Sequence, residues 1–211
     1  MPDLYSEEKY FRSQGFLHLA GVDEVGRGCL AGPVFAAAVI LPPELQIPEL
    51  NDSKKLKPKQ RESISEIIHR EALALHIASI DSEEIDRINI LHASLKAMAV
   101  ALLALKIPPH LVLVDGNQKV PVDMQQKTLV GGDGRCASIA AASVIAKVAR
   151  DRYMSEQESH FPNFSFSEHK GYGTAKHQEE LKKHGPTPLH RRSFGPVQQF
   201  NLFSSSSLRI S

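Results

Sequence analysis

Several acidic residues follow apolar segments at points where short strands are expected to end. They are Asp23 and Glu24 at the end of the segment 16–24, Asp115 after 111–114, and Asp133 after 127–130. Carboxylate oxygens are the hard ligands that Mg²⁺ and Mn²⁺ prefer, and burying several carboxylates without a cation is costly. Because the acids belong to separate elements and are expected to lie at one edge of the sheet, the pattern indicates a divalent-metal site.

An alternative interpretation treats these acids as turn and cap residues. Asp before Gly is common in turns, and both Asp115-Gly116 and Asp133-Gly134 fit that pattern. Asp23 and Glu24 raise a further difficulty, because adjacent residues in a regular strand point to opposite faces. Both can approach one metal only if the strand ends, twists or bulges there, and the glycines that follow allow this. Asp52 is interpreted as a loop acid.

The elements that position these acids alternate between strand and helix. Strands are expected at 16–24, 34–41, 73–80, 111–114 and 127–130, and helices from 57, over 81–105, after 136 and over 175–184. Short apolar runs bounded by glycine, and apolar residues at helical spacing, support these assignments. The sequence therefore predicts an α/β fold. We expect a lead-in over 1–15, a catalytic domain over 16–200 that includes a C-terminal helical segment, and a flexible, Ser-rich tail over 201–211.

Composition excludes several classes of protein. The chain has 211 residues with 42% hydrophobic content, which suits one generous domain, and its formal net charge is only +1. Lysine and arginine are nevertheless concentrated in 51–70 and in the C-terminal third, where they suit phosphate contact or a solvated face. No apolar stretch is long enough for a membrane span, and Cys29 and Cys136 are too few for a disulfide framework. We expect a cytoplasmic protein without membrane contact.

Five motifs in order along the chain resemble one known family. They are GVDEVGRGCLAGPV at 21–34, DSKKL at 52–56, LVDG at 113–116, Gly132-Asp133 leading into SIAAASVIAKVARDR, and KGYGT at 170–174. Together they resemble the type 2 ribonucleases H, the family of bacterial ribonuclease HII, from about Gly21 to Phe194. The resemblance implies a ribonuclease H-like fold, in which helices flank a mixed sheet.

The resemblance also implies an endonuclease of replication and repair that hydrolyses the RNA strand of RNA/DNA hybrids. It would incise 5′ of ribonucleotides embedded in duplex DNA, as in ribonucleotide excision, and leave 5′-phosphate and 3′-hydroxyl ends. The metal-binding and catalytic residues would be Asp23, Glu24, Asp115 and Asp133. Two divalent ions, Mg²⁺ or Mn²⁺, would activate the attacking water and stabilise the departing oxygen.

Substrate contacts follow from the same resemblance. Gly26, Arg27 and Gly28 would contact the 2′-hydroxyl at the RNA–DNA junction, Tyr172 would sense the junction, and Lys54 and Lys55 would bind the backbone. Arg135 departs from the lysine more usual in the family, which puts a phosphate contact there in doubt. His169 is interpreted as a loop histidine, with proton transfer or phosphate contact as the alternative.

Other functions remain open at this point. A junction resolvase of the same broad fold would prefer branched DNA, and a metal-dependent phosphatase would have little use for the basic segments. A non-catalytic hybrid-binding module would have no need of all four acids. We expect a monomer that binds RNA/DNA hybrids and DNA containing ribonucleotides. The sequence specifies neither the preferred metal nor any contact with a replication clamp.

Overall fold

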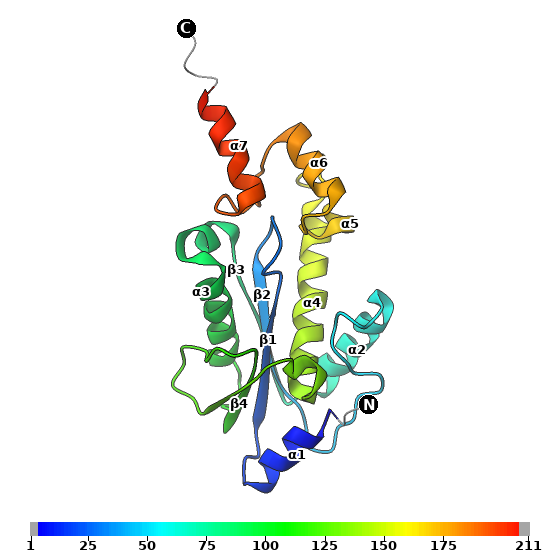
Figure 1. The fold of residues 1–211 in the computed structure, drawn as a ribbon. Helices are drawn as coiled ribbons and strands as arrows, with labels where there is room; N and C mark the ends of the chain where they lie inside the picture. Colours follow the sequence, from blue (N-terminus) through cyan, green and yellow to red (C-terminus); the bar gives the residue numbers. More distant parts are fainter. Residues whose placement is uncertain (1–3, 207–211) are drawn as a thin grey trace. The chain divides into compact units, whose positions relative to one another are not determined.

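A computed structural model describes the backbone of residues 4–206 and the side chains up to residue 200 (Figure 1). Strands and helices alternate through the first two-thirds of the chain, and helices alone follow. The elements are α1 Ser6–Ser13, β1 Leu19–Val25, β2 Val34–Ile40, α2 Pro58–Glu71, β3 Ala74–Ile80, α3 Ser82–Leu103, β4 Leu111–Asp115, β5 Gln126–Leu129, the 3₁₀ turn η1 Gly132–Gly134, α4 Ala137–Gln157, α5 Phe166–His169, α6 Ala175–His184 and α7 Gly195–Ser206.

The strands form one mixed sheet with the order β3-β2-β1-β4-β5. β1 pairs antiparallel with β2 and parallel with β4, which in turn pairs parallel with β5. The mixed sheet flanked by helices, with helices alone at the C-terminal end, confirms the predicted α/β class. Parallel pairing brings the carboxyl ends of β1, β4 and β5 to the same edge of the sheet.

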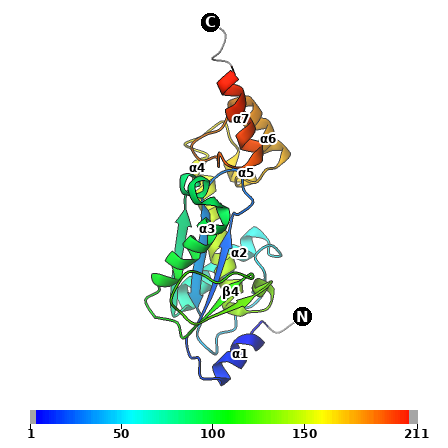
Figure 2. The same cartoon turned by 60° about the vertical axis from the view of Figure 1, so that its left-hand side comes forward.

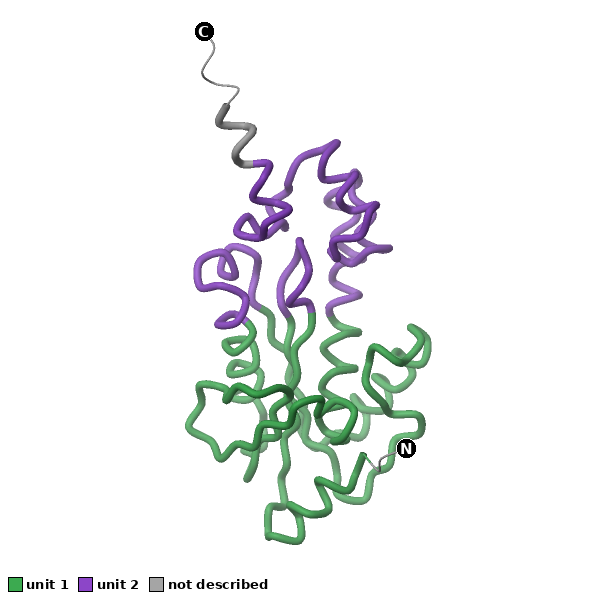
Figure 3. The backbone as a smooth tube through the Cα atoms, viewed as in Figure 1, with its two compact units in different colours: residues 1–25, 35–79, 94–149 green, residues 26–34, 80–93, 150–211 purple. Residues whose placement is uncertain are grey.

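Residues 4–206 fall into two compact units, each assembled from separate segments (Figure 3). Unit 1 contains residues up to 25, then 35–79 and 94–149, and therefore most of the sheet. Unit 2 contains 26–34, 80–93 and the residues from 150 onward. The predicted catalytic domain over 16–200 contributes to both units, so each is described separately below.

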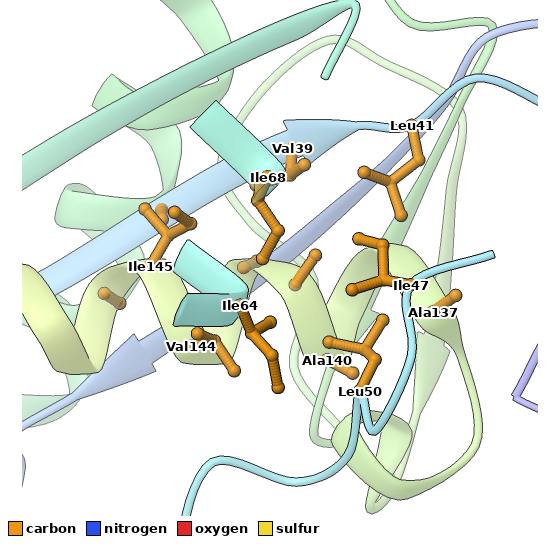
Figure 4. Close-up of a cluster of buried hydrophobic side chains, with 14 of the residues drawn as sticks. Val39, Leu41, Ile47, Leu50, Ile64, Ile68, Ala137, Ala140, Val144 and Ile145 are labelled. Carbon is orange, nitrogen blue, oxygen red and sulfur yellow. The ribbon is translucent and has the colours of Figure 1, made fainter. Parts of the chain in front are cut away.

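In unit 1 a hydrophobic core fills the space between the sheet and the helices α2 and α4 (Figure 4). Val39 of β2 packs with Ile64 and Ile68 of α2 and with Val144 and Ile145 of α4. The small residues Ala140, Ala141 and Ala142 are fully buried, which lets α4 lie close to the strands. The C-terminal part of α3 covers the opposite side of the strands (Figures 1 and 2).

The structure adds detail to two predicted segments. The expected lead-in over 1–15 contains helix α1, whose Glu8 is buried and accepts a hydrogen bond from the Ser138 N–H at 2.6 Å. The helix predicted over 81–105 is interrupted at Asn89, where φ is 66°. The Asn89 side chain accepts from the Leu91 and His92 N–H groups, so it caps the helical segment that follows.

The predicted tail over 201–211 overlaps α7, which continues to Ser206. Extending an existing helix needs no new nucleation, which explains how it runs on into the serines. Residues 207–211 lie outside the described residues. None of the helices in the described part is long and apolar enough to cross a membrane.

Gly21 provides a test of the contact between β1 and α4. A Cβ atom at this position would lie 2.1 Å from the Ser138 carbonyl carbon and 2.3 Å from the Ile139 nitrogen, both backbone atoms that a side-chain rotation cannot move. We expect Gly21→Val to lower the free energy of unfolding by about 3 kcal/mol. Denaturant unfolding would measure the loss, with Gly195→Ala, which meets no atom within 4 Å, as the control. Equal stability of the two variants would contradict this packing.

Candidate active site

The strand register places Asp23 and Asp115 side by side. Gly21 lies opposite Leu113 and Val22 opposite Val114 in the parallel pair of β1 and β4, so the next residues along are the two acids. Strand alternation puts Asp23 on the same face as Gly21, the face on which α4 packs. Asp23 is 5% exposed, so its carboxylate is almost fully removed from water.

Asp133 reaches the same region through a short turn. The Asp115 Oδ1 atom accepts a hydrogen bond from the Gly132 N–H at 2.7 Å, which fixes the 3₁₀ turn that carries Asp133. Gly131 enters this turn with a left-handed φ of 64°, a conformation that glycine adopts without strain. Three of the predicted acids are therefore brought together in unit 1.

Glu24 differs from the other three acids. β1 keeps a regular register with β2 through Val25, so the strand neither ends nor bulges between Asp23 and Glu24. Glu24 therefore alternates to the face opposite Asp23. Its negative charge still acts on Asp23, because the two residues are adjacent.

The gathered carboxylates repel one another. Burial raises the pKa of Asp23 well above the ordinary value, and the charges of Glu24 and Asp115 add to the rise. Burial likewise raises the pKa of Asp133, and Asp52 and Asp115 reinforce it, whereas Lys54 opposes it. A centre in which acids hold their protons more tightly than usual is one that a cation would stabilise.

The donor atoms suit a hard divalent cation, because all of them are carboxylate oxygens. As the described residues lie, no three Asp, Glu, His or Cys side chains are grouped to hold one ion. The acids instead accept protein donors: Asp23 Oδ1 accepts from the Glu24 N–H at 2.7 Å, Asp115 Oδ1 accepts from Gly132, and Asp133 pairs with Lys54. The chemistry of the residues fits a divalent ion, and a protein donor engages one oxygen of each acid.

The basic loop over 51–57 lies beside the acids in unit 1. The Lys54 Nζ atom is 3.5 Å from Asp133 Oδ2, and the Lys55 Nζ atom is 3.8 Å from Asp52 Oδ2. Burial alone would lower the pKa of Lys54, but the charges of Asp133, Asp52 and Asp23 raise it overall. Both lysines keep exposed side chains, which suits contact with an external phosphate.

Asp52 was interpreted from the sequence as a loop acid, and that interpretation is incomplete. Its side chain shares a hydrogen bond with Asp133 and accepts the Lys54 N–H at 2.9 Å. Arg135, the departure from the family pattern, pairs with Glu7 of α1 at 2.6 Å. The guanidinium is therefore engaged within the protein, and it ties the start of α4 to α1.

The glycine-rich segment 26–34 belongs to unit 2. Gly26 has a φ of 93°, and a Cβ atom there would lie 2.2 Å from the Arg150 Nε atom, so both the backbone and the space require glycine. Arg27 and Gly28 lie at the surface. Backbone hydrogen bonds from Leu30 N–H to Gly171 and from Gly32 N–H to Leu189 hold the segment.

Two fully buried arginines support this segment, and sequence reasoning missed both roles. Arg191 donates to the carbonyl oxygens of Gly26, Arg27 and Gly32 at 2.7–3.0 Å. Arg150 donates to those of Ala31, Pro33 and Lys170 at 2.9–3.1 Å. Burial lowers the pKa of Arg191 to about 10, so its charge persists at neutral pH and is solvated by backbone dipoles.

Tyr172 is 38% exposed and lies next to the glycine-rich segment in unit 2 through a bridge with Cys29. The Arg150 guanidinium is 5.7 Å from the centre of the Tyr172 ring. This cation–π contact holds one face of the ring. The predicted substrate residues Gly26, Arg27, Gly28 and Tyr172 thus share unit 2.

Two buried histidines, His177 and His190, support the backbone at Tyr172 through a chain of hydrogen bonds. His190 Nδ1 accepts from the Thr187 N–H, so its Nε2–H donates to His177 Nε2 at 3.0 Å, and His177 Nδ1–H donates to the Tyr172 carbonyl at 2.9 Å. Burial lowers the pKa of His177 to about 4 and that of His190 to about 3, so both are neutral at pH 7. His169 is buried against Glu180 at 2.9 Å and is therefore an internal structural residue.

Comparisons with known proteins identify what this arrangement resembles. The family model described as ribonuclease HII matches residues 20–197. Ribonuclease HII of Endomicrobium trichonymphae is 50% identical over 209 residues, which cover 99% of this chain and 99% of the relative. Ribonuclease HII of Geotalea daltonii is 50% identical over 198 residues, with 94% and 92% covered.

Solved structures agree with this similarity. The ribonuclease HII of Archaeoglobus fulgidus, solved in a complex with PCNA, has a TM-score of 0.72 and 26% identity over 84% of this chain and 95% of its own. The ribonuclease H2 of Pyrococcus horikoshii has a TM-score of 0.72 at 24% identity, with 88% and 98% covered. These likenesses confirm the predicted ribonuclease H-like fold.

Arg191 provides a test of how the glycine-rich segment is held. Arg191→Gln removes donors from buried carbonyl oxygens, so we expect a loss of about 3 kcal/mol and faster amide hydrogen exchange in residues 26–34. The neighbouring Arg192→Gln, at an exposed position, is the matched control. Exchange rates in 26–34 that were the same in both variants would show that Arg191 does not fix this segment.

Proposed function

Because the chain belongs to the ribonuclease HII family and is a ribonuclease H enzyme, we propose that it hydrolyses the RNA strand of RNA/DNA hybrids and incises 5′ of ribonucleotides embedded in duplex DNA. The products would be 5′-phosphate and 3′-hydroxyl ends. The observation that carries the proposal is the gathering of Asp23, Asp115 and Asp133 at one end of the sheet, where the raised pKa values of Asp23 and Asp133 favour a bound cation.

The divalent ions that this site would hold supply an activated water and stabilise the departing oxygen. Asp23 is the most buried of these acids and would be shared by two ions of Mg²⁺ or Mn²⁺. Asp115 and Asp133 would each complete one side of the site. Glu24 points to the other face of β1, so it would contribute only to an ion lying beyond the end of the strand.

The lysines of the basic loop would bind the nucleic-acid backbone. Lys54 is close to Asp133, so its ammonium would lie near a phosphate held at the acidic centre. Lys55 is paired with Asp52, which restrains its side chain at the surface of the loop. These positively charged groups favour a polyanionic substrate over a small phosphate ester.

The glycine-rich segment and Tyr172 would distinguish RNA from DNA. Only RNA carries the 2′-hydroxyl, which both donates and accepts hydrogen bonds. Gly28 is exposed and leaves open space where a side chain would be, so its backbone is approachable by a sugar. The half-exposed Tyr172 ring offers a flat face to the neighbouring nucleotide.

Family membership argues against the rival functions. A junction resolvase would cut branched DNA and ignore the 2′-hydroxyl, and a small-molecule phosphatase would not need Lys54 and Lys55. A binding module without chemistry would not need the acids. We propose that the protein acts as a monomer in the cytoplasm, on hybrids and on DNA that contains ribonucleotides.

Cleavage of duplex DNA that carries a single ribonucleotide tests the proposal. With Mg²⁺ or Mn²⁺ the wild-type protein should incise 5′ of the ribonucleotide and leave an all-DNA duplex intact. Asp115→Asn should reduce the rate by about 10³-fold, because it removes one negative ligand of the divalent ion that would stabilise the reacting phosphate. Asp123→Asn, a change at an exposed loop acid, is the control and should keep the full rate.

Two results would contradict the proposal. One is no incision by the wild-type protein with either metal. The other is equal cleavage of the two duplexes, which would show that the 2′-hydroxyl is not recognised and would favour the resolvase alternative.

A further inference from the structure

Two buried serine hydroxyls connect the basic loop to the acidic centre in unit 1. Ser53, in the loop over 51–57, is 3% exposed, and Ser143, in α4, is 4% exposed. Their Oγ atoms are 2.9 Å apart although the residues are 90 positions apart in the sequence. The Ser143 hydroxyl also forms a hydrogen bond with the Asp23 carboxylate.

The geometry of β1 and α4 explains why Ser143 meets Asp23. Ser138 packs over Gly21, where the missing side chain permits close approach. The Ile139 backbone nitrogen also lies over Gly21. Four residues along a helix advance about 6 Å and return to the same face, and two residues along a strand advance about 6.6 Å. Ser143, one turn beyond Ile139, therefore lies over Asp23. The close packing of α4 on β1, which requires glycine at position 21, also places the Ser143 hydroxyl beside the Asp23 carboxylate.

The direction of the hydrogen bonds follows from the inventory of donors. With a divalent ion bound, Asp23 would be ionised and would only accept, so Ser143 would donate its single hydroxyl proton to that carboxylate. Ser143 then acts as the acceptor toward Ser53, and Ser53 is the donor. A continuous chain of hydrogen bonds runs from the Ser53 hydroxyl through the Ser143 hydroxyl to Asp23, in a buried setting that strengthens each bond.

The loop at the other end of this chain is itself anchored. The Arg61 Nη1 atom donates to the Ser53 carbonyl at 3.0 Å and to the Leu56 carbonyl at 2.6 Å. Lys54, next in sequence to Ser53, lies 3.5 Å from Asp133. The loop is thus linked to the acidic centre twice, from Ser53 through Ser143 to Asp23 and from Lys54 directly to Asp133.

We propose that Ser53 and Ser143 are positioning residues that orient the Asp23 carboxylate for the divalent ion and tie the lysine loop to it. The inference rests on the proposed function. The Glu24 N–H holds Oδ1 of Asp23, and the Ser143 hydroxyl provides a second donor, so the carboxylate plane is fixed from two sides. Removing the hydroxyl would leave Asp23 free to rotate within a buried site and would release the loop.

Binding of Mg²⁺ to the protein without substrate, measured by titration calorimetry, tests this proposal. Ser143→Ala should weaken Mg²⁺ binding by about tenfold, the effect usual for residues that orient a metal ligand. Ser53→Ala should weaken it by about threefold, because it acts through Ser143. Ser65→Ala, which removes another buried serine hydroxyl of unit 1, is the matched control and should leave the affinity unchanged.

The double variant makes the test specific. If the chain runs through Ser143, then Ser53→Ala should have no effect on Mg²⁺ affinity once Ser143→Ala is present. Ser53→Thr keeps a hydroxyl and should restore wild-type affinity. Additive effects, or unchanged Mg²⁺ affinity in Ser143→Ala at full folding, would overturn the proposal.

These outcomes are separate from failure of the proposed function. If wild-type protein neither binds Mg²⁺ nor cleaves the ribonucleotide duplex, the proposed function fails. If the wild type does both and the serine variants bind Mg²⁺ equally well, only the positioning role fails.

Discussion

The repulsion among buried carboxylates at the carboxyl ends of β1 and β4 is the constraint on which unit 1 depends. Asp23 is nearly inaccessible to water and lies beside a second acid in the adjacent strand. Each acid accepts at least one fixed donor: Glu24 N–H and Ser143 for Asp23, Gly132 N–H for Asp115, and Lys54 for Asp133. These donors come from the sheet, from α4, from the η1 turn and from the basic loop. These four parts of unit 1 therefore act together to stabilise neighbouring negative charges.

In unit 2 the glycine-rich segment 26–34 must be held in one conformation, although three of its nine residues are glycines without a side chain. The glycine-rich segment 26–34 cannot be held by packing alone, so buried arginines bind its carbonyl oxygens. The neutral histidines do the same for the backbone at Tyr172. In both cases a side chain from a distant part of the sequence fixes the backbone conformation.

The sequence allowed much of this to be predicted. Apolar runs that end in acids located the strands and three members of the acidic centre. Buried strands require apolar residues, and a metal site requires acids at the strand ends, so both can be recognised in the sequence. It did not reveal Arg191, because a buried arginine that binds backbone carbonyls looks in sequence like any surface arginine. It also did not reveal Ser143, since a small residue on a helix that packs closely against a sheet has no distinctive spacing. Nor did it reveal the contact of the loop acid Asp52 with Asp133, because that contact depends on tertiary folding.

The most direct test of the central claim compares the stability of wild type and Asp23→Asn with and without Mg²⁺. Because burial and neighbouring charge raise the pKa of Asp23, the folded protein holds this proton more tightly than the unfolded chain. The metal-free protein therefore loses stability as the pH rises from the ordinary Asp range to the raised folded-state value.

At neutral pH without metal, we predict that Asp23→Asn is more stable by about 1 kcal/mol, because it removes a buried carboxyl group whose charge Glu24 and Asp115 oppose. Mg²⁺ should stabilise the wild type and leave the variant unchanged, so the order of stability reverses. An Asp23→Asn protein that was less stable than wild type without Mg²⁺, or equally stabilised by Mg²⁺, would contradict the claim that repulsion among these acids governs the site.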